Sequence, residues 1–364
     1  MRILHIITSL KMGGAERALC NMLTHMRNKS YQHHVAYFHP GPFVEELTKL
    51  GIPTYHIKGL VYRYDPWAYK NICSLVKKIQ PNALHTSLWA ANILGRLVGK
   101  KFNISVISDL HGNATDEGKL RNFLERHTAH LSTHIVAVSD SVAGAYRQTV
   151  IKAPKNLIVI KNGINPDTIK TMAQQNPIKR SDLGFPENAF VIGTVGRLEV
   201  IKSYDVLLKA FAVLKAPNSF LCIVGDGSQR PILEALAKQL GISHAVLFAG
   251  AQANPYPYYP LFDCFALSST SEGLSLALLE ALTFGLPVVT THNNQTHDVL
   301  THGTHGFLVP PAQPTQLANA LNSIITNPEI ANAMRVANAH LIDEHYHIQR
   351  VVKQYNSLFT NTSA

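Results

Sequence analysis

Short apolar runs alternate with longer amphipathic stretches along most of this chain. The apolar runs are mostly four to seven residues long, are rich in Val and Ile, and end near Gly, Pro or Asn, which is typical of buried strands. Polar residues do not occupy every second position, so we expect helices to cover both faces of parallel sheets. The predicted strands are Ile3–Thr8, His34–Phe38, Val106–Asp109, Ile135–Ser139, Leu157–Lys161, Phe190–Val195, Phe220–Val224, Ala245–Ala249, Cys264–Leu267, Pro287–Thr291 and Gly306–Val309.

Stretches with apolar residues at helical spacing lie between these strands. The stretch 276–284 is followed by Gly285, Leu286 and Pro287, and a glycine followed by a proline commonly ends a helix. The predicted helices are Ala15–Met26, Pro66–Ile79, Leu88–Phe102, Tyr204–Leu214, Ile232–Leu240, Leu276–Phe284 and Tyr346–Phe359.

The alternation of strands and helices pauses in residues 165–188, a polar segment with three prolines that we interpret as an interdomain linker. A length of 364 residues also suits two domains of about 150–200 residues each. The pattern therefore predicts an α/β protein with two Rossmann-like, doubly wound parallel-sheet domains, residues 1–165 and 166–344.

The composition is that of a globular protein, with 46% hydrophobic and 15% charged residues, and excludes collagen-like and disordered chains. Cys20, Cys73, Cys222 and Cys264 form no CxxC pair, which favours buried free thiols in a reducing compartment. The apolar opening MRILHII is short and polar residues follow it, and no run approaches the roughly 18 apolar residues of a spanning helix. We therefore expect a cytoplasmic protein without a secretory signal.

The net charge of +10 is distributed unevenly along the chain. Residues 1–165 contain 21 Lys and Arg against 9 Asp and Glu, a balance of +12, whereas residues 166–364 contain 12 against 14, a balance of −2. Such asymmetry marks a surface that meets polyanions, with nucleic acid and anionic membrane as the candidates.

The strongest signal for a functional site is SSTSEGLSLALLEALTFGLPVV, residues 268–289. A polar turn there joins a predicted strand to a helix that begins near Ser275, and backbone amides at a helix start suit a phosphate. Gly273 lets the backbone approach a ligand closely. Glu272 and Glu280 suit two carboxylates that contact different hydroxyl groups of one extended ligand. The structural alternative makes Glu272 a helix cap and Glu280 a solvated surface residue.

Three further motifs follow predicted strands. Arg197 and Lys202 lie at the carboxyl edge of a strand, where two cations suit a pyrophosphate or are simply exposed charges. Gly13 and Gly14 form a tight turn that exposes backbone amides after the first strand. His111 precedes the glycine that ends the motif SDLHG, where a loop would enter an interdomain cleft.

These motifs resemble a known family. GGAER, SDLHG, VIKNGIN, GRLEVIK, VGDG and SEGLSLALLEAL occur in the order found in the retaining glycosyltransferases of family 4, which have the GT-B fold. The resemblance covers nearly the whole chain, and its specific part is the spaced glutamate pair with the preceding arginine and lysine. It implies two domains facing each other across a cleft, with a C-terminal helix, residues 345–364, joined to the first domain.

The resemblance also implies how the donor is held. Arg197 and Lys202 would neutralise the donor's diphosphate, which would also accept hydrogen bonds from the amides of Gly273, Leu274 and Ser275. Such fixed charges stabilise a leaving diphosphate most in the transition state. No cofactor or metal is then expected, because protein cations supply the positive charge.

The remaining candidate residues receive their roles from the same resemblance. Glu280 would hold the ribose hydroxyls, and Glu272 would contact hydroxyls of the donor sugar. His111 would reach the donor sugar near the reacting carbon. Gly13 and Gly14 would approach the phosphates from the opposite wall of the cleft.

On this resemblance the chain transfers a hexose or N-acetylhexosamine to a glycan or lipid-linked acceptor, in surface polysaccharide or lipopolysaccharide-type biosynthesis. A UDP-sugar is the favoured donor and GDP-mannose the other candidate, since the Pro- and Tyr-rich residues 251–260 reveal no base contact. The acceptor would bind the basic first domain. Its helices 66–79 and 88–102 mix Trp and aliphatic residues with Lys or Arg, which suits peripheral contact with an anionic inner leaflet unless their apolar faces pack on the sheet.

The sequence gives weaker support to other functions. His127, His130 and His134 have spacings that could join imidazoles around a metal on one predicted helix, but no carboxylate partner accompanies them. A nicotinamide dehydrogenase should show GxGxxG and a later acidic residue, and neither is present. No nucleic-acid-binding signature appears. A non-catalytic relative that binds sugar nucleotides or regulates a partner remains the alternative, although every expected catalytic position is filled.

Overall fold

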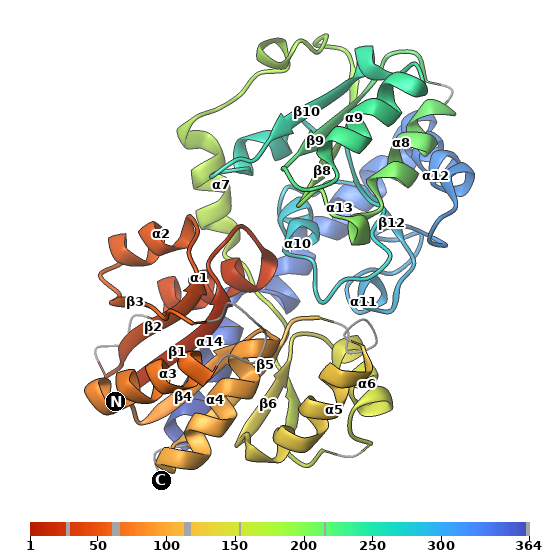
Figure 1. The fold of residues 1–364 in the computed structure, drawn as a ribbon. Helices are drawn as coiled ribbons and strands as arrows, with labels where there is room; N and C mark the ends of the chain where they lie inside the picture. The colour runs from red at the N-terminus through yellow and green to blue at the C-terminus, as the bar shows by residue number, and fades with distance from the viewer. Residues whose placement is uncertain (27–29, 60–65, 113–117, 153, 215, 362–364) are drawn as a thin grey trace. The chain divides into compact units, whose positions relative to one another are not determined.

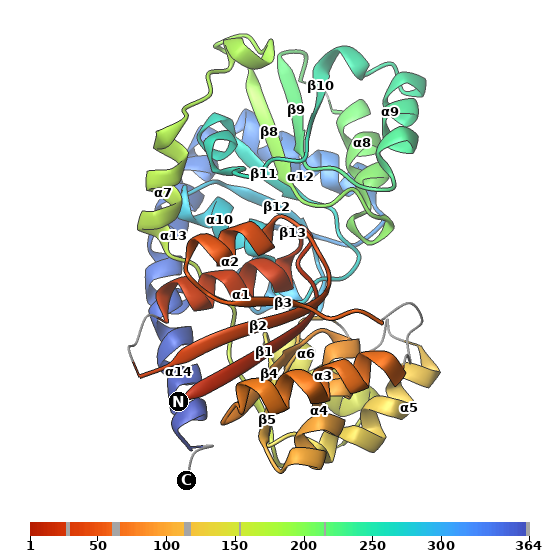
Figure 2. The same cartoon turned by 60° about the vertical axis from the view of Figure 1, so that its left-hand side comes forward.

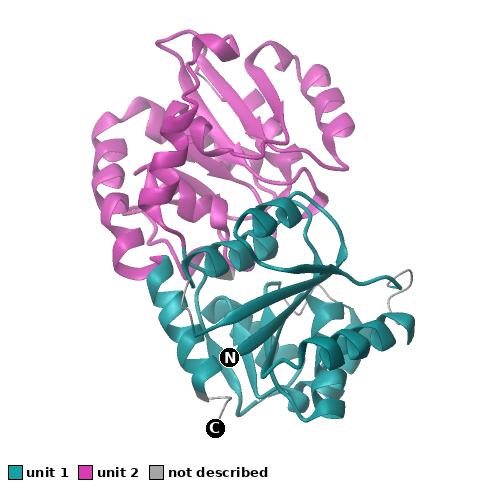
Figure 3. Cartoon of the chain, turned by 90° about the vertical axis from the view of Figure 1, so that its left-hand side faces the viewer, with its two compact units in different colours: residues 1–163, 348–364 teal, residues 164–347 magenta. Residues whose placement is uncertain are grey.

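The structure is a computed structural model that describes residues 1–26, 30–59, 66–112, 118–152, 154–214 and 216–361 (Figure 1). The chain divides into two compact units. Unit 1 combines residues 1–163 with 348–364, and unit 2 comprises residues 164–347 (Figure 3).

Unit 1 contains a seven-stranded parallel sheet in the order β3-β2-β1-β4-β5-β6-β7. Alternate residues of β1 enter different cores: Ile3 and Ile7 pack with α1, α2 and α14, whereas Leu4 and Ile6 pack with α3 and α4. Figure 2 shows these helices around the sheet. Both faces are therefore covered, as the apolar strand pattern predicts. The strands are β1 Arg2–Ser9, β2 Gln32–His39, β3 Thr54–His56, β4 Ala83–Ser87, β5 Ser105–Leu110, β6 His134–Ala137 and β7 Leu157–Val159. The helices are α1 Gly14–His25, α2 Phe43–Lys49, α3 Pro66–Ile79, α4 Trp89–Phe102, α5 Lys119–Thr128, the 3-10 helix η2 Ala129–Leu131, α6 Asp140–Thr149 and α14 Ile348–Asn361.

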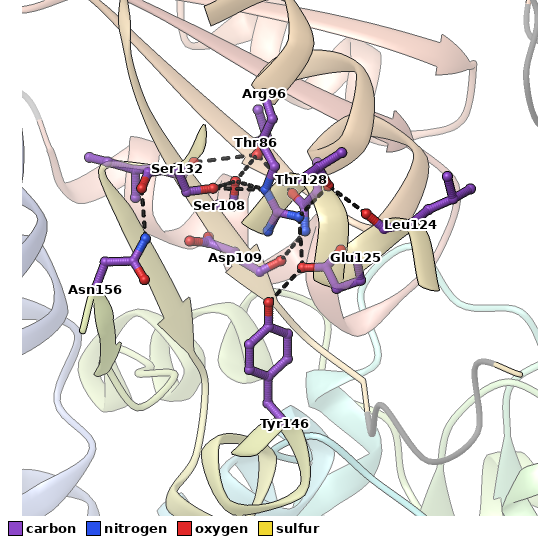
Figure 4. A network of polar contacts seen from close by, with 12 residues as sticks. Thr86, Arg96, Ser108, Asp109, Leu124, Glu125, Thr128, Ser132, Tyr146 and Asn156 are labelled. Atoms are coloured by element: carbon purple, nitrogen blue, oxygen red, sulfur yellow. Dashed lines mark hydrogen bonds and ion pairs between the residues drawn. The ribbon is translucent and has the colours of Figure 1, made fainter. Parts of the chain in front are cut away.

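A buried ion pair ties α4 to α5 next to strand β5 (Figure 4). Arg96 is fully buried and its Nη1 lies 2.7 Å from Oε1 of Glu125. Arg96 Nε donates to the hydroxyl of Ser132 at 2.7 Å, and the hydroxyl of Tyr146 on α6 donates to Glu125 at 3.0 Å. Since a buried charge is costly without partners, this network fixes α5 and α6 against the sheet.

Unit 2 contains a six-stranded parallel sheet in the order β10-β9-β8-β11-β12-β13. Ile192, Leu221 and Ala266 belong to its main core, which also contains the buried residues of α8 and α12. The strands are β8 Phe190–Val195, β9 Ser219–Val224, β10 Val246–Gly250, β11 Cys264–Leu267, β12 Val288–Thr291 and β13 Gly306–Val309. The helices are α7 Pro166–Gln175, η3 Ser181–Leu183, η4 Val200–Lys202, α8 Tyr204–Ala212, α9 Arg230–Gln239, η5 Ser243–Ala245, η6 Tyr256–Leu261, α10 Leu276–Thr283, α11 Asn294–His297, α12 Pro314–Thr326 and α13 Pro328–His345.

The interpretation of residues 165–188 as an interdomain linker is wrong. Residues 166–175 form helix α7, and the whole segment belongs to unit 2. Asn165 caps the helix by accepting from the amides of Asp167 and Thr168, and Pro166 occupies the first helical position. An asparagine followed by a proline is a helix-start signal as well as a turn signal, and here it starts a helix.

The four cysteines are free and buried, as expected from their spacing. No helix among the described residues is both long enough and apolar enough to cross a lipid bilayer.

Candidate functional site

Two loops of unit 2 are bonded to each other at the carboxyl ends of the neighbouring strands β8 and β11. The amide of Thr270, after β11, donates to the carbonyl of Ile201 at 2.9 Å. The hydroxyl of Ser268 donates to the carbonyl of Lys202 at 2.9 Å. These bonds bring the cationic motif after β8 to the start of α10, although the two motifs are about 70 residues apart in the sequence.

The same contact pairs two of the predicted site residues. Lys202 Nζ lies 2.6 Å from Glu272 Oε1, and the side chains are only 21% and 11% exposed. The hydroxyl of Ser269 donates to the same carboxylate oxygen at 2.7 Å. A charge-assisted pair with so little exposure holds both groups in defined positions. A diphosphate at this place would compete with Glu272 for the ammonium group of Lys202.

Arg197 stands at the end of a tightly packed turn after β8. The preceding residue is Gly196, and Gly225 of the VGDG motif lies against it with a φ of +142°. A Cβ on Gly225 would come within 2.0 Å of the carbonyl oxygen of Gly196. Glycine is therefore required where the turns after β8 and β9 touch. Arg197 itself is exposed at this edge.

The start of α10 is capped by Ser275, whose hydroxyl accepts from the amide of Leu278 at 3.4 Å. Leu274 is buried and Gly273 half-buried. The alternative that makes Glu272 the helix cap is thus wrong. The amides at this helix start still present the positive end of its dipole, which suits an anion.

Glu280 is buried rather than solvated, with 5% exposure, so its alternative role as a surface residue is also wrong. The hydroxyl of Tyr259 in η6 donates to Glu280 Oε2 at 2.5 Å. The ring of Tyr259 stacks on Phe284, with centroids 5.5 Å apart. Burial, and then the charge of Glu280, raise the pKa of Tyr259 well above its ordinary value, so the phenol remains a donor. The Pro- and Tyr-rich segment thus orients a candidate ribose-binding carboxylate.

Gly13 and Gly14 begin helix α1 in unit 1. Gly13 is the N-cap residue, and as a glycine it has no side chain that could cap the helix. A Cβ on Gly13 would come within 2.3 Å of Glu16 Oε2, so a carboxylate already lies at the positive end of α1. A phosphate would have to share this end with Glu16.

His111 follows β5 in unit 1 and its side chain is 10% exposed. Its Nε2 atom lies 3.8 Å from Oδ2 of the buried Asp109, which also accepts from His85 Nε2 at 2.7 Å. Burial opposes ionisation of Asp109, but the neighbouring imidazoles of His85 and His111 hold its pKa below the ordinary carboxyl value. The sequence alone gives no reason to assign a role to Asp109 or His85, because a polar residue within a strand is not by itself evidence of a functional site.

The structure separates the three histidines that could have formed a metal site. His127 lies in α5, His130 in η2 and His134 in β6, so the prediction that one helix carries all three is wrong. Within the described part of the chain, no three His, Cys, Asp or Glu side chains are placed to hold a metal ion.

Comparisons with known proteins identify both halves of the chain. Residues 12–168 match the model described as Glycosyltransferase Family 4, and residues 175–340 match the model described as Glycosyl transferases group 1. An uncharacterized glycosyltransferase of Haemophilus influenzae is 27% identical over 95% of this chain and 96% of its own length. The Escherichia coli UDP-Gal:alpha-D-GlcNAc-diphosphoundecaprenol alpha-1,3-galactosyltransferase is 24% identical over 79% of this chain and 78% of its own length.

Solved structures show the same fold. HepE of Anabaena in complex with UDP-glucose matches with a TM-score of 0.87 and 22% identity, over 99% of this chain and all of that one. Two parallel-sheet α/β units and two family models that together span most of the sequence lead to one conclusion. The chain belongs to the family-4 type of glycosyltransferases, which have the GT-B fold.

Proposed function

We propose that this glycosyltransferase moves a hexose or N-acetylhexosamine from a UDP-sugar to a glycan or lipid-linked acceptor, in surface polysaccharide or lipopolysaccharide-type biosynthesis. Two similar proteins support this proposal: HepE, in complex with UDP-glucose, and the Escherichia coli enzyme, whose name specifies UDP-Gal and a diphosphoundecaprenol-linked acceptor. GDP-mannose is the other candidate donor.

The observation that carries the proposal is the bonded pair of loops at the start of α10. Lys202 is held there by Glu272, and Arg197 lies in the turn after the neighbouring strand β8. We infer that both cations and the amides of Gly273, Leu274 and Ser275 bind the donor's diphosphate. Negative charge grows on the phosphate oxygens as the sugar leaves, so charges fixed at this place lower the barrier more than they strengthen ground-state binding.

Two carboxylates would orient the rest of the donor. Glu280, fixed by Tyr259, would accept hydrogen bonds from the ribose hydroxyls. Glu272 would bind hydroxyls of the donor sugar, so the same group would position both Lys202 and the sugar. His111 of unit 1 would contact the sugar near the reacting carbon.

We propose that transfer retains the configuration of the donor sugar. The acceptor oxygen would form its bond to the anomeric carbon on the face from which the diphosphate departs. The bond between this carbon and the diphosphate oxygen breaks with its electron pair, and the departing oxygen takes the proton of the acceptor hydroxyl. Protein cations supply the positive charge in this scheme, so it includes no metal or cofactor.

The acceptor side of the proposal rests on the basic unit 1. Helix α3 buries Ala68, Ile72 and Val76 in the core, but its Trp67 is 66% exposed with Lys70 over its ring. An exposed tryptophan beside lysines suits an anionic lipid surface. Sedimentation with vesicles should increase with their content of anionic lipid and decrease in Trp67→Ala. Binding that ignores anionic lipid content would contradict this part.

A panel of UDP-, GDP- and ADP-sugars tests the donor, with thermal shift and donor hydrolysis as readouts. We expect UDP-sugars to give the largest response, and the charge reversals Arg197→Glu and Lys202→Glu to abolish it. Lys209→Glu is the matched control, because Lys209 is an exposed lysine of α8 paired with Asp205. Unchanged binding of UDP in the Arg197 and Lys202 variants would refute the assignment of the site.

A further inference from the structure

A row of titratable side chains, three of them buried and His33 half-buried, crosses the sheet of unit 1 and ends beside His111. His33, His5, His85 and Asp109 lie on the consecutive strands β2, β1, β4 and β5 of the sheet. The successive contacts are 3.0 Å from His33 Nδ1 to His5 Nε2, 2.8 Å between the Nδ1 atoms of His5 and His85, and 2.7 Å from His85 Nε2 to Asp109 Oδ2. Exposure is 0% for His5, 1% for His85 and 4% for Asp109.

The acceptor at the end of the row determines which nitrogen carries each proton. An ionised carboxylate can only accept, so His85 donates from Nε2 and, when neutral, accepts at Nδ1. His5 then donates from Nδ1 and accepts at Nε2, which leaves Nδ1 of His33 as the donor to it. Burial lowers the pKa of His33 to about 4 and that of His5 well below 6.5, so both rings are neutral at physiological pH. His5 and His33 therefore add no charge to the core beside His85 and Asp109.

Helix α14 covers this row. The ring of Tyr355 lies 5.3 Å from that of His85, and the ring of Phe359 lies 6.2 Å from that of His5. Both side chains are buried, so α14 packs closely over the row. The hydrogen bonds that join His5, His85 and Asp109 are thus buried, and hydrogen bonds in a buried environment hold their geometry strongly.

A small cavity lies where the row ends. It is lined by His111, Asp109, His85, Asn162 and Tyr355, together with apolar residues of α1 and α14. Both Asp109 Oδ1 and His111 Nε2 are buried there, and neither makes a hydrogen bond to another of the described residues. The titratable groups lining this cavity are His85, Asp109, His111 and Tyr355, so Asp109 is the carboxylate that faces His111.

We propose that Asp109 is the positioning residue of His111 and holds the imidazole with its Nε2–H directed at the carboxylate. Nδ1 of His111 then faces away from Asp109 as an acceptor for a hydroxyl of the donor sugar. His85, held by His5 and His33, fixes the carboxylate by the hydrogen bond that it donates. This inference rests on the proposed function, because it assigns the orientation of the residue that would contact the sugar.

The kinetic test uses Asp109→Asn, which keeps an oxygen for the hydrogen bond from His85 and removes the charge beside His111. We expect kcat to fall by about tenfold or more, as when a histidine is held in the wrong tautomer. The donor KM should change by less than about threefold, because groups of unit 2 bind most of the donor. Asp140→Asn is the matched control, since Asp140 is an exposed aspartate of unit 1. A kcat at the wild-type level in Asp109→Asn would overturn the proposal.

A second measurement needs neither donor nor acceptor. In protein labelled with ¹⁵N-histidine, the imidazole signals of His111 are those missing in His111→Gln. We expect the tautomer protonated at Nε2 in the wild type and in Asp140→Asn, and a mixture of tautomers in Asp109→Asn. A His111 protonated at Nδ1, or a tautomer unchanged by Asp109→Asn, overturns the proposal even if kcat falls. If the expected tautomers appear but no sugar of the donor panel is hydrolysed or transferred, the proposed function fails while the positioning by Asp109 stands.

Discussion

Acidification should destabilise unit 1 through the half-buried His33. The imidazole has its pKa lowered to about 4 in the folded unit, mainly by burial, against 6.5 for the ordinary side chain. Between these values the unfolded chain binds a proton that the folded unit excludes. The free energy of unfolding therefore rises with pH in this window. The contribution of the neutral His33 is fully present above the ordinary pKa of 6.5 and is lost as the pH falls below that value.

The size of the effect follows from the two pKa values. At pH 7.5 both states hold the ring almost entirely neutral, and at pH 5.0 the ring is protonated mainly in the unfolded chain. With 6.5 and about 4 as the two pKa values, linkage gives a loss of about 2 kcal/mol from His33 between these pH values. The pKa of Asp109 is lowered as well. The stability that such an ionised carboxylate contributes is lost only below the ordinary carboxyl pKa, so Asp109 does not add to the change between pH 7.5 and pH 5.0.

Urea unfolding followed by tryptophan fluorescence measures this loss in unit 1 alone, because both tryptophans of the chain, Trp67 and Trp89, lie in that unit. The comparison is between wild type and His33→Asn, whose amide nitrogen can replace Nδ1 as the donor to His5. We expect the wild type to lose about 2 kcal/mol more than the variant between pH 7.5 and pH 5.0. His130→Asn, at an exposed position of the same unit, should lose as much as the wild type. Equal losses in wild type and His33→Asn would refute the reasoning.

Three further substitutions and one treatment test other parts of the structure. Glu125→Ala leaves the buried Arg96 without its carboxylate partner. We expect the unfolding free energy of unit 1 to fall by about 3–5 kcal/mol in the same fluorescence assay. A loss below about 1 kcal/mol would contradict the role of this ion pair. Glu272→Ala should lower kcat, whereas the Kd for UDP, measured by calorimetry, should stay equal or decrease, because the carboxylate no longer competes for Lys202. A large increase in this Kd would contradict the competition between Glu272 and the diphosphate. Tyr259→Phe removes a hydrogen bond to a buried carboxylate, and we expect weaker UDP binding, by about tenfold, corresponding to about 1.4 kcal/mol. Dialysis against EDTA should leave the initial transfer rate unchanged, and a loss restored by a divalent cation would contradict donor activation by protein cations.

The fold could be predicted from the sequence wherever burial alone determines the pattern. The predicted strands 190–195, 264–267 and 306–309 coincide with β8, β11 and β13, because strands covered on both faces are mainly apolar. Strand β4, residues 83–87, was missed, since His85, Thr86 and Ser87 interrupt its apolar pattern although every residue of the strand is buried. These side chains are compatible with the core because partners on neighbouring strands satisfy them, and such partners cannot be seen from one strand's sequence.

In the candidate site, too, contiguous motifs could be predicted from the sequence, whereas contacts between distant segments could not. The start of α10 could be predicted because its turn, glycine and helix are contiguous in the sequence. Its contact with the loop after β8 could not, since Ile201 and Thr270 meet only through the strand order of the sheet. Tyr259 was visible as part of an unusual Pro- and Tyr-rich segment, but its hydrogen bond to Glu280 depends on the packing of η6 against α10.

The strand order also explains why the histidine row has no signature in the sequence. His5, His33 and His85 each stand in a different strand, separated by 28 and 80 positions from their partners in the row. They meet because β2, β1 and β4 are neighbours and because all three side chains face the side of the sheet covered by α14. Removing any one of them would leave a buried polar atom of the next without its partner, at a cost of about 1–3 kcal/mol. The side chains of the row therefore depend on one another for their hydrogen bonds, and the row ends at the carboxylate that faces His111.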